Sequence, residues 1–429
     1  MKIIKYPDKT NWAALLKRPA FDTLNLEKMV QSVLEDVKQN GDEAVKKYTL
    51  QFDGANIESV LVTENEIVEA EKLVSDELKS AIQLASKNIK AFHSAQKEET
   101  KFIETMPGVT CWRRSISIQK VGLYIPGGTA PLFSTILMLG IPATLAGCEE
   151  IVLCTPPDKG GNINPVILYT ARLIGITKLF KVGGVQAIAA MAYGTEQIPM
   201  VYKIFGPGNQ YVTCAKQLIN KQGIAIDMPA GPSELAVFAD DSCIPEFVAA
   251  DLLSQAEHGS DSQVILVSTS EEVINNIQKE LASQLALLPR KDLAANALEN
   301  SKAILVSTNS DAIDLVNEYA PEHLILACKN DEQLADQILN AGSIFLGNFS
   351  CESAGDYASG TNHTLPTNGH AKAYSGVSLD SFVKKITYQK ITQQGINAIG
   401  PAIELMAEAE GLQAHKNSVT VRLKNKQNV

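Results

Sequence analysis

The sequence predicts an α/β protein in which helices flank parallel sheets, and three observations support this fold class. The chain has 429 residues, which is more than one ordinary domain holds. From residue 109 onward, short apolar segments alternate with segments of helix length, as in parallel sheets with helical crossovers. The composition is 45% hydrophobic, 6% aromatic and 20% charged, which is normal for a globular α/β protein. We therefore predict two Rossmann-like domains, with helical extensions at both ends of the chain.

Changes in sequence texture divide the chain into four predicted regions. These are a helical N-terminal extension (1–105), a first α/β domain (106–235), a second α/β domain with a long irregular loop (236–378) and a helical C-terminal tail (379–429). The N-terminal extension contains an amphipathic helix at 24–40, which Gly41 should end, and a longer charged helical stretch at 64–97. His93 lies in the second stretch, and we interpret it as structural. The tail, helical over 391–424, is long enough to reach a partner subunit.

Charge, hydropathy and cysteine usage exclude several classes of protein. The net charge of −10 argues against nucleic acid and anionic membranes as main partners. No run of about 18 apolar residues is present, as a transmembrane helix would need, and the first residues lack the apolar stretch of a secretory signal. The seven cysteines are scattered and form no CxxC pair, which is typical of reduced, buried thiols in a cytoplasmic protein. A nucleophilic cysteine is the less favoured alternative, because none lies beside a histidine.

Three glycine-containing turns follow predicted strands of the first α/β domain. They lie at residues 126–128, 183–184 and 206–209. Ligands bind at the carboxyl ends of parallel strands, and glycine lets the backbone approach a phosphate. The turns therefore suggest a nucleotide site, but each can also be an ordinary connection between a strand and a helix. The G-x-G-x-x-G fingerprint with a following acidic residue is absent, so the turns alone do not establish NAD.

The stretch at residues 224–267 predicts a strand, a sharp turn, a second strand, an amphipathic helix and a third strand. Proline and glycine break the backbone just before Ser233, which leaves a hydroxyl at the turn. Near the end of the helix, Gln255 and His258 are three residues apart and face the same surface patch, and Gly259 ends the helix. This spacing suits two ligands of one metal ion. A polar helix end capped by glycine is the alternative for these residues taken alone.

Further candidates for a site lie in the second α/β domain. Glu322 and His323 stand at the entrance of a predicted strand, where both side chains can reach one cleft, although a surface Glu-His pair is the simpler interpretation of this dipeptide. Residues 350–376 are predicted to be irregular, and an unstructured stretch of this length inside a compact protein is usually functional. This stretch contains Asp356, a candidate ligand or acid/base group, and His370, which we interpret as a loop residue.

Five sequence motifs carry a resemblance to a known family. They are IDMPAGPSE (226–234), LLSQAEHG (252–259), YAPEHL (319–324), GDYASGTNHTLPT (355–367) and HKNSV (415–419). With these motifs the chain resembles histidinol dehydrogenase over nearly its full length. The resemblance implies oxidation of L-histidinol through L-histidinal to L-histidine with two NAD molecules, in the last steps of histidine biosynthesis.

The resemblance also implies a set of site residues. The implied zinc ligands, with one zinc ion per subunit, are Gln255, His258, Asp356 and His415. The implied substrate contacts are Ser233, Gln255, His258, His323, Asp356, His363, Glu410 and His415. The implied NAD contacts are Tyr124, Gln186 and Asn209, which lie in or beside the three glycine-containing turns. Two imidazoles, a carboxylate and an amide oxygen suit a borderline ion such as zinc. The family further implies a homodimer in which the tail of one subunit completes the active site of the other.

The chemistry assigns roles to the adjacent pair Glu322 and His323. Oxidation of an alcohol needs a base that takes the hydroxyl proton as the hydride leaves, and an imidazole suits this task, so we assign it to His323. The second oxidation needs water added to the aldehyde, and we assign deprotonation of that water to Glu322. Covalent catalysis by a cysteine is the weaker alternative for this step.

Two other classes of function compete with the dehydrogenase. One is a zinc hydrolase in which Glu322 activates a metal-bound water and the glycine-containing turns are purely structural. The other is a nucleotide-binding regulatory protein in which the Glu-His pair lies on the surface. Histidinol-dependent formation of NADH would support the dehydrogenase and neither alternative.

Overall fold

The structure is a computed structural model that describes residues 1–18, 23–127, 131–229 and 231–424. Its contacts divide the chain into two compact units. The larger unit contains Met1–Gln96 and Ile118–Phe382, and the smaller unit contains Lys97–Ser117 and Val383–Val429. No helix among the described residues combines the length and the apolar character needed to cross a membrane.

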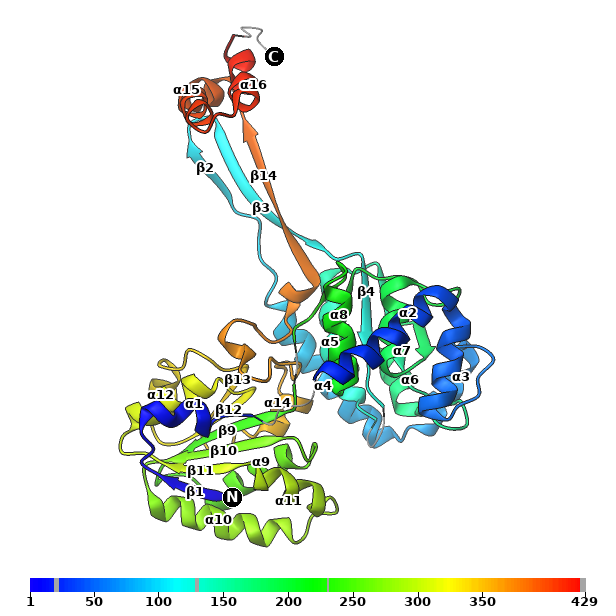
Figure 1. Ribbon diagram of the computed structural model, residues 1–429, viewed down its shortest axis with the longest axis vertical. Helices are drawn as coiled ribbons and strands as arrows, with labels where there is room; N and C mark the ends of the chain where they lie inside the picture. Colours follow the sequence, from blue (N-terminus) through cyan, green and yellow to red (C-terminus); the bar gives the residue numbers. More distant parts are fainter. Residues whose placement is uncertain (19–22, 128–130, 230, 425–429) are drawn as a thin grey trace. The chain divides into compact units, whose positions relative to one another are not determined.

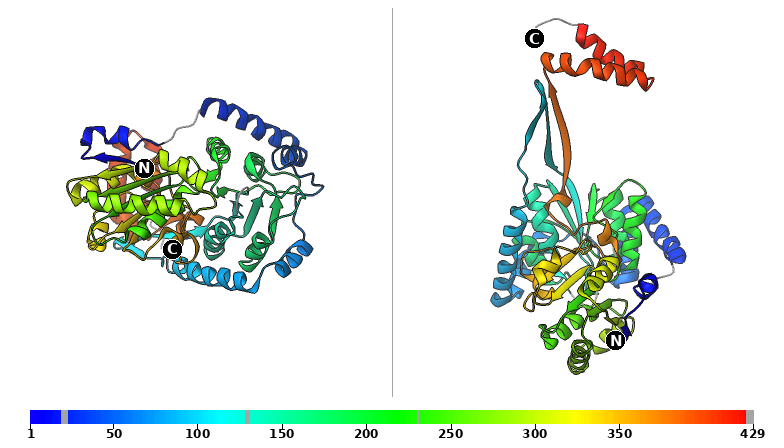
Figure 2. Two further views of the ribbon diagram at one scale, coloured as in Figure 1. Left: turned by 90° about the horizontal axis from the view of Figure 1, so that it is seen from below. Right: turned by 90° about the vertical axis from the view of Figure 1, so that its left-hand side faces the viewer.

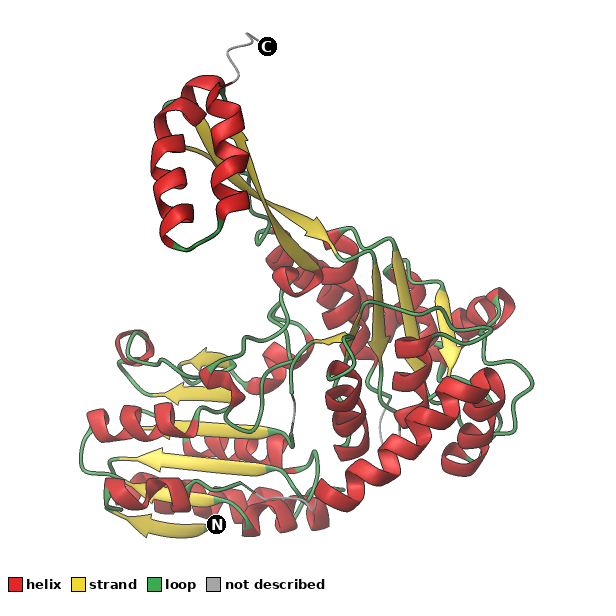
Figure 3. Ribbon diagram, turned by 45° about the horizontal axis from the view of Figure 1, so that its top comes forward, coloured by secondary structure: helices red, strands yellow, loops and turns green. Residues whose placement is uncertain are grey.

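The first sheet of the larger unit has six parallel strands in the order β1-β11-β10-β9-β12-β13 (Figure 1). The strands are β1 (Lys2–Lys5), β9 (Glu234–Ala239), β10 (Gln263–Ser268), β11 (Lys302–Leu305), β12 (His323–Ala327) and β13 (Ser343–Leu346). Strands β9, β10 and β12 are buried at every position, because helices cover both faces of the sheet (Figure 3).

Alternate residues of β9 enter two separate cores, one on each face of this sheet. Leu235 and Val237 pack with the helices α9 to α11, whereas Ala236 and Phe238 pack with α1 and α12. The helices of this part of the chain are α1 (Trp12–Leu15), α9 (Pro245–Ala256), α10 (Glu271–Leu285), α11 (Lys291–Glu299), α12 (Asn309–Tyr319), α13 (Asp331–Ala335) and α14 (Glu352–Tyr357). Residues on one strand therefore connect the two layers of helices.

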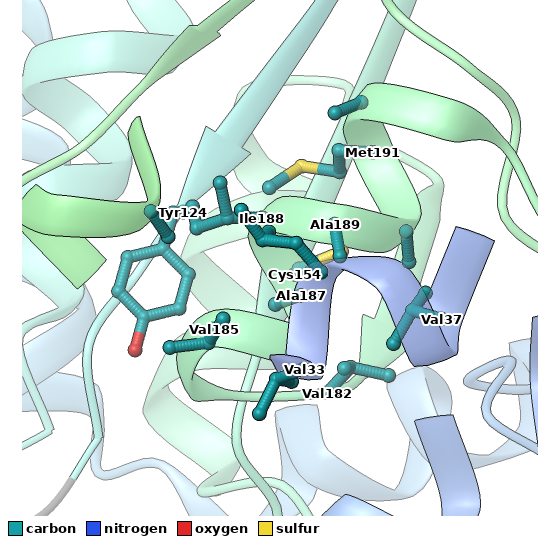
Figure 4. Close-up of a cluster of buried hydrophobic side chains, with 14 of the residues drawn as sticks. Val33, Val37, Tyr124, Cys154, Val182, Val185, Ala187, Ile188, Ala189 and Met191 are labelled. Atoms are coloured by element: carbon teal, nitrogen blue, oxygen red, sulfur yellow. The ribbon is translucent and has the colours of Figure 1, made fainter. Parts of the chain in front are cut away.

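The second sheet of the larger unit has five parallel strands in the order β6-β5-β4-β7-β8. The strands are β4 (Lys120–Tyr124), β5 (Glu150–Thr155), β6 (Lys178–Lys181), β7 (Lys203–Phe205) and β8 (Ala225–Ile226). The connecting helices are α5 (Phe133–Ala146), α6 (Pro165–Leu173), α7 (Gly184–Tyr193) and α8 (Gln210–Asn220). Figure 4 shows one of its cores, in which Val33 and Val37 pack against Val185 and Ile188 of α7.

Three further helices pack on the helices that flank this second sheet. They are α2 (Thr23–Tyr48), α3 (Glu64–Leu73) and α4 (Asp76–Ser94), and a short π-helix, η2 (Thr49–Asp53), follows α2. Gly41 has a non-helical backbone, with φ +51° and ψ −132°, and separates two helices within α2, so the helix predicted at 24–40 ends at Gly41 as expected. The charged stretch that was predicted as continuous is divided into two helices, because Ser75 caps the start of α4 by accepting a hydrogen bond from Leu78 N. His93 is fully buried, as expected of a structural residue.

The smaller unit consists of a three-stranded antiparallel sheet and two helices (Figure 2). The elements are β2 (Phe102–Met106), β3 (Val109–Ser117), β14 (Val383–Ile391), α15 (Gln393–Ala409) and α16 (Gln413–Lys424). The ring of Trp112 stacks on Tyr388 at 5.4 Å and lies 5.1 Å from Phe102, so aromatic pairs connect all three strands.

The two α/β sheets and most of their elements agree with the fold predicted from the sequence, but the antiparallel sheet, strand β1 and two helices were not predicted. Strand β1 joins the six-stranded sheet although its region was expected to be helical, because its pairing partner β11 lies about 300 residues away. Strand β14 and helix α11 were missed as well, and α14 forms within the stretch that was expected to be irregular. The boundaries between the four predicted regions stay a prediction, since the compact units combine segments that are distant in sequence.

A buried ion pair holds the turn after β7. Lys216 and Asp227 form a salt bridge with side chains that are 4% and 1% exposed. Lys216 Nζ donates to Gly206 O at 2.8 Å, and Gly206 N donates to Asp227 Oδ2 at 2.8 Å. Both polar groups of the Gly206 peptide are thereby satisfied by one ion pair. Gly206 has φ +133°, and a Cβ there would lie 2.1 Å from Tyr124 O, so only glycine fits.

Replacing Lys216 by methionine should lower the free energy of unfolding by about 3–5 kcal/mol, because Asp227 would stay buried without its counter-charge. Adding Asp227→Leu should recover part of this loss, since no unpaired charge is then buried. Urea titration of the two variants and the parent protein measures both effects. A Lys216→Met variant as stable as the parent protein would show that the ion pair does not stabilise the turn.

Candidate active site

Glu322 and His323 are held at the start of β12, the strand between β9 and β13. His323 pairs with Leu235 on one side and Ser343 on the other. The carboxylate Oε2 of Glu322 accepts a hydrogen bond from Glu234 N at 2.9 Å. Both side chains are buried, with 6% of Glu322 and 4% of His323 exposed. The interpretation of this dipeptide as a surface pair is therefore wrong, because neighbouring strands cover it on both sides.

Three carboxylates surround the imidazole of His323. Nδ1 lies 3.8 Å from Glu322 Oε2 and 4.0 Å from Glu352 Oε1, and Nε2 lies 3.6 Å from Asp356 Oδ1. Burial alone would lower the pKa of His323, but the charges of Glu352, Glu322 and Asp356 raise it to about 10. Burial raises the pKa of Glu322 to about 8. The charges of both side chains therefore depend on burial and on the neighbouring carboxylates.

A group of possible metal ligands lies beside this imidazole. One ligand atom each of His258, Glu352 and Asp356 lie within 4.8 Å of one another. His258 follows the end of α9, and the two carboxylates lie four residues apart on α14, which places them on the same face of that helix. Burial lowers the pKa of His258, which favours the neutral imidazole that binds metals.

Gln255 lies in the last turn of α9, three residues before His258, and is fully buried. Both polar atoms of its amide lack a hydrogen-bond partner among the described residues. A buried amide without a partner costs free energy unless a ligand satisfies it. Together with an imidazole and carboxylates, it forms a donor set that fits a divalent ion such as zinc.

The loop after α14 connects this group with the second sheet. His363 Nδ1 lies 3.0 Å from Asp356 O, and His363 Nε2 lies 3.1 Å from Thr135 Oγ1 on α5. Asn362 Nδ2 also donates to Met138 O on the same helix at 2.6 Å. These bonds fix the imidazole of His363 between the two sheets. Ser233 lies directly before β9, is half-buried and accepts a hydrogen bond from Gln263 N through its carbonyl oxygen.

A cavity of about 1350 Å³ opens at the carboxyl ends of strands β4 and β5. Tyr124 and Asn209 line it, as does Gly184, which donates its N–H to Tyr124 Oη at 3.1 Å. Gln186 is fully buried next to this lining, and neither polar atom of its amide has a partner among the described residues. The three side chains expected to contact NAD thus lie in or beside one cavity whose size fits a dinucleotide. Gly128 of the first glycine-containing turn is outside the described residues.

The two α/β sheets use opposite strand ends for their candidate sites. The cavity lies at the carboxyl ends of the five-stranded sheet, as expected for this fold. Glu322 and His323, in contrast, lie at the amino end of β12 in the six-stranded sheet. The rule that ligands bind at carboxyl ends therefore applies to the five-stranded sheet only.

The candidate site includes residues that sequence reasoning missed. Glu352 is the most direct, since it lies beside His323 and belongs to the possible metal group. Arg18 and Glu234 lie next to Glu322 and were also missed. Arg18 Nη2 donates to Glu234 Oε2 at 2.8 Å and to Tyr319 O at 2.7 Å. The spacing of Glu352 and Asp356 would have indicated a shared face if α14 had been recognised as a helix. We find no sequence signal that would have identified Arg18.

Glu410 and His415 belong to the smaller unit. Glu410 follows the end of α15, and His415 lies in the first turn of α16. Both side chains are exposed. The other predicted zinc and substrate residues all belong to the larger unit.

Comparisons with known proteins identify the family of this chain. A family model described as histidinol dehydrogenase matches residues 16–423. The histidinol dehydrogenases of Bacteroides thetaiotaomicron and Bacteroides fragilis are 62% and 63% identical to this chain over 423 residues, which is 99% of each chain. The crystal structure of histidinol dehydrogenase from Elizabethkingia anophelis is 58% identical, has a TM-score of 0.97, and the match covers 99% of this chain and 98% of that one. The chain therefore belongs to the histidinol dehydrogenase family of oxidoreductases.

Proposed function

We propose that this protein oxidises L-histidinol through L-histidinal to L-histidine, with two NAD molecules and one zinc ion per subunit, in the last steps of histidine biosynthesis. The observation that carries the proposal is the position of His323. The buried imidazole of His323 lies beside a group of possible metal ligands. The same unit contains a cavity of dinucleotide size. Family membership supports the substrate and the reaction.

Gln255, His258 and Asp356 would hold the zinc ion, and His415 would complete the set. When bound, zinc would hold the amine and imidazole of histidinol, and its positive charge would offset the nearby carboxylates. The carbinol carbon would then be fixed for hydride transfer. Ser233, His363 and Glu410 would contribute further substrate contacts. The unsatisfied amide of Gln255 supports this assignment, since it needs a partner that the described residues do not supply.

Tyr124, Gln186 and Asn209 would hold NAD, which supplies the hydride acceptor when it is bound. The unpaired amide of Gln186 and the cavity lined by the other two residues support this assignment. Asn209 already accepts hydrogen bonds from Tyr211 N and Val212 N, so it caps α8 and its side chain is held in a single orientation at the cavity.

His323 would take the hydroxyl proton in each oxidation. Its pKa of about 10 results from the three carboxylates around it, so neutralising their charge by a bound cation would lower this pKa and free the imidazole to act as a base. Glu322 would deprotonate the water that adds to histidinal. Because the buried Glu322 has a pKa of about 8, this step is favoured towards alkaline pH, where the carboxyl is ionised.

Both alternatives for the chemistry receive less support. A zinc hydrolase would need no nucleotide, so it would not explain the cavity or the unpaired amide of Gln186. Covalent catalysis needs a thiolate, but burial raises the pKa of Cys148 and Cys328 to about 12 and that of Cys243 to about 11. All seven cysteines are free thiols.

We further propose a homodimer in which each active site takes His415 and Glu410 from the partner subunit. In the smaller unit, large apolar side chains are exposed although soluble monomers rarely expose many together. These are Phe102, Ile103, Ile386, Ile391, Leu405, Met406, Leu412 and Val421. An interface between two copies of the chain would cover such a surface.

The direct test of the proposed function is the formation of NADH from NAD and histidinol, with the amount of NADH counted per histidinol consumed. We expect two NADH per histidinol. A hydrolase or a regulatory nucleotide-binding protein would form none.

Removing the metal with a chelator should abolish turnover and leave the fold largely intact, because the ligands come from separate segments at the edge of the site. Zinc, and other divalent ions of similar size, should restore activity. Circular dichroism before and after chelation is the control for the fold. Full activity in a preparation shown to contain no metal would contradict the assigned zinc.

A further inference from the structure

The cavity proposed for NAD contains two buried polar atoms that no described residue satisfies. They are Oδ2 of Asp53 and Oγ1 of Thr155, and both residues line the cavity. Asp53 is the last residue of η2, and Thr155 is the last residue of β5. Buried acceptors without a donor are unfavourable, so these atoms indicate a ligand that brings hydroxyl or amide donors.

Asp53 lies near the ends of strands β4 and β5. Its charge contributes, after burial, to the raised pKa of Tyr124, the last residue of β4. A Cβ on the adjacent Gly54 would lie 3.6 Å from Lys159 Cγ, in the segment that follows β5. Although Asp53 comes from the N-terminal helical region, its carboxyl thus lies where the first two strands of a dinucleotide-binding sheet end.

The other acidic residues that line this cavity already have partners. Asp158 Oδ1 accepts hydrogen bonds from Gly160 N and Asn162 N in its own loop. Glu66 forms a salt bridge with Lys181, and Glu69 forms one with Lys72. Of the four acidic residues that the structure places in the lining, Asp53 alone has a buried oxygen without a partner.

In dinucleotide-binding domains of this type, an acidic residue near the end of the second strand holds the 2′-hydroxyl of the adenosine ribose. Strand β5 takes that place here, since it pairs with β4, but it ends in Cys154 and Thr155. We infer that Asp53 supplies the missing carboxylate: it accepts hydrogen bonds from the adenosine ribose of NAD and, by its charge, excludes the 2′-phosphate of NADP. Thr155 Oγ1 is a second contact for the same sugar. This inference rests on the proposed NAD-linked function.

The test is the variant Asp53→Asn, which keeps the size of the side chain and removes its charge. We expect kcat/KM for NAD to fall roughly ten-fold or more, which is the size of one hydrogen bond to a charged group. The loss should appear in KM, because the carboxylate contacts the cofactor far from the reacting carbon. The ratio of kcat/KM for NADP to that for NAD should rise by roughly ten-fold or more. Calorimetric titration with ADP-ribose should show a matching loss of affinity without any turnover.

Two variants serve as controls. Glu58→Gln makes the same change of charge five residues further along the chain, at an exposed position outside the cavity lining, and should leave both cofactors unaffected. Glu69→Gln removes a charge from the lining, but that carboxylate is paired with Lys72, so the ratio for the two cofactors should change much less than with Asp53→Asn.

The outcomes separate this inference from the proposed function. If the parent protein forms no NADH with histidinol, the proposed function fails whatever Asp53 does. If the parent protein is active but Asp53→Asn keeps its affinity for ADP-ribose and its preference for NAD, Asp53 does not hold the ribose. An equal shift in cofactor preference with Glu69→Gln would show a general effect of charge in the cavity and would also overturn the inference.

Discussion

Replacing His323 by asparagine is expected to slow both oxidation steps about 10²–10⁴-fold, the usual loss when a general base is removed. Asparagine cannot take a proton, and both alcohol oxidation and oxidation of the hydrate need one removed. The fold should persist, because β12 is held by pairing with β9 and β13 on both sides. Rates are measured separately with histidinol and with histidinal as the supplied substrate.

Glu322→Gln provides the matched comparison, since it alters the adjacent residue and keeps its size. The hydrogen bond from Glu234 N can still be accepted by the amide oxygen, so the pocket should keep its shape. We expect histidinal oxidation to be impaired much more than the first hydride transfer. Equal losses in the two half-reactions would refute the division of labour between Glu322 and His323.

Mixing two inactive variants is expected to restore about a quarter of the activity, if the active sites are shared between subunits. His258→Ala and His415→Ala should each be nearly inactive alone. In a mixed dimer one site receives both defects and the other receives neither. Random assembly makes half of the dimers mixed, so about a quarter of all sites are intact in composition. Co-expression followed by the NADH assay measures the recovery.

A second pair of variants is the control for this experiment. His258 and Asp356 both belong to the larger unit, so His258→Ala mixed with Asp356→Ala should not recover activity. If the first pair shows no recovery although mixed dimers are demonstrably present, His415 serves its own subunit and the shared-site proposal is wrong.

Local signals predicted the elements of the two α/β sheets well. Helix α6 has clear local start signals, because Asn164 caps it and Pro165 opens it. Strands β9 and β10 follow from continuous apolar runs, as expected for strands buried on both faces. Strands that pair with distant segments were not predictable in this way. Nothing in the local sequence of residues 2–5 or 383–391 indicates which strand lies beside each of them.

The candidate site shows the same limit. Helical spacing made Gln255 and His258 candidate metal ligands, although α9 ends before His258. The burial of Glu322 and His323 depends on β9 and β13, which lie far away in sequence. The motif resemblance therefore supplied the assignment of the site residues, and the structure adds which of those in the larger unit lie together. Glu352 was missed because its position relative to His323 depends on how α14 packs, which no spacing in the sequence reveals.

The pairing of β1 with β11 has a consequence for how the protein is made. Residues 2–5 are synthesised about 300 residues before their partner, Lys302–Leu305. At roughly 5–20 residues per second, the first strand waits about 15–60 s for its neighbour. The two central isoleucines of β1 stay outside any sheet for that time. The six-stranded sheet therefore lacks its β1 edge strand until most of the chain has been synthesised. The earlier five-stranded sheet, whose strands span only residues 120–226, is free to form well before that.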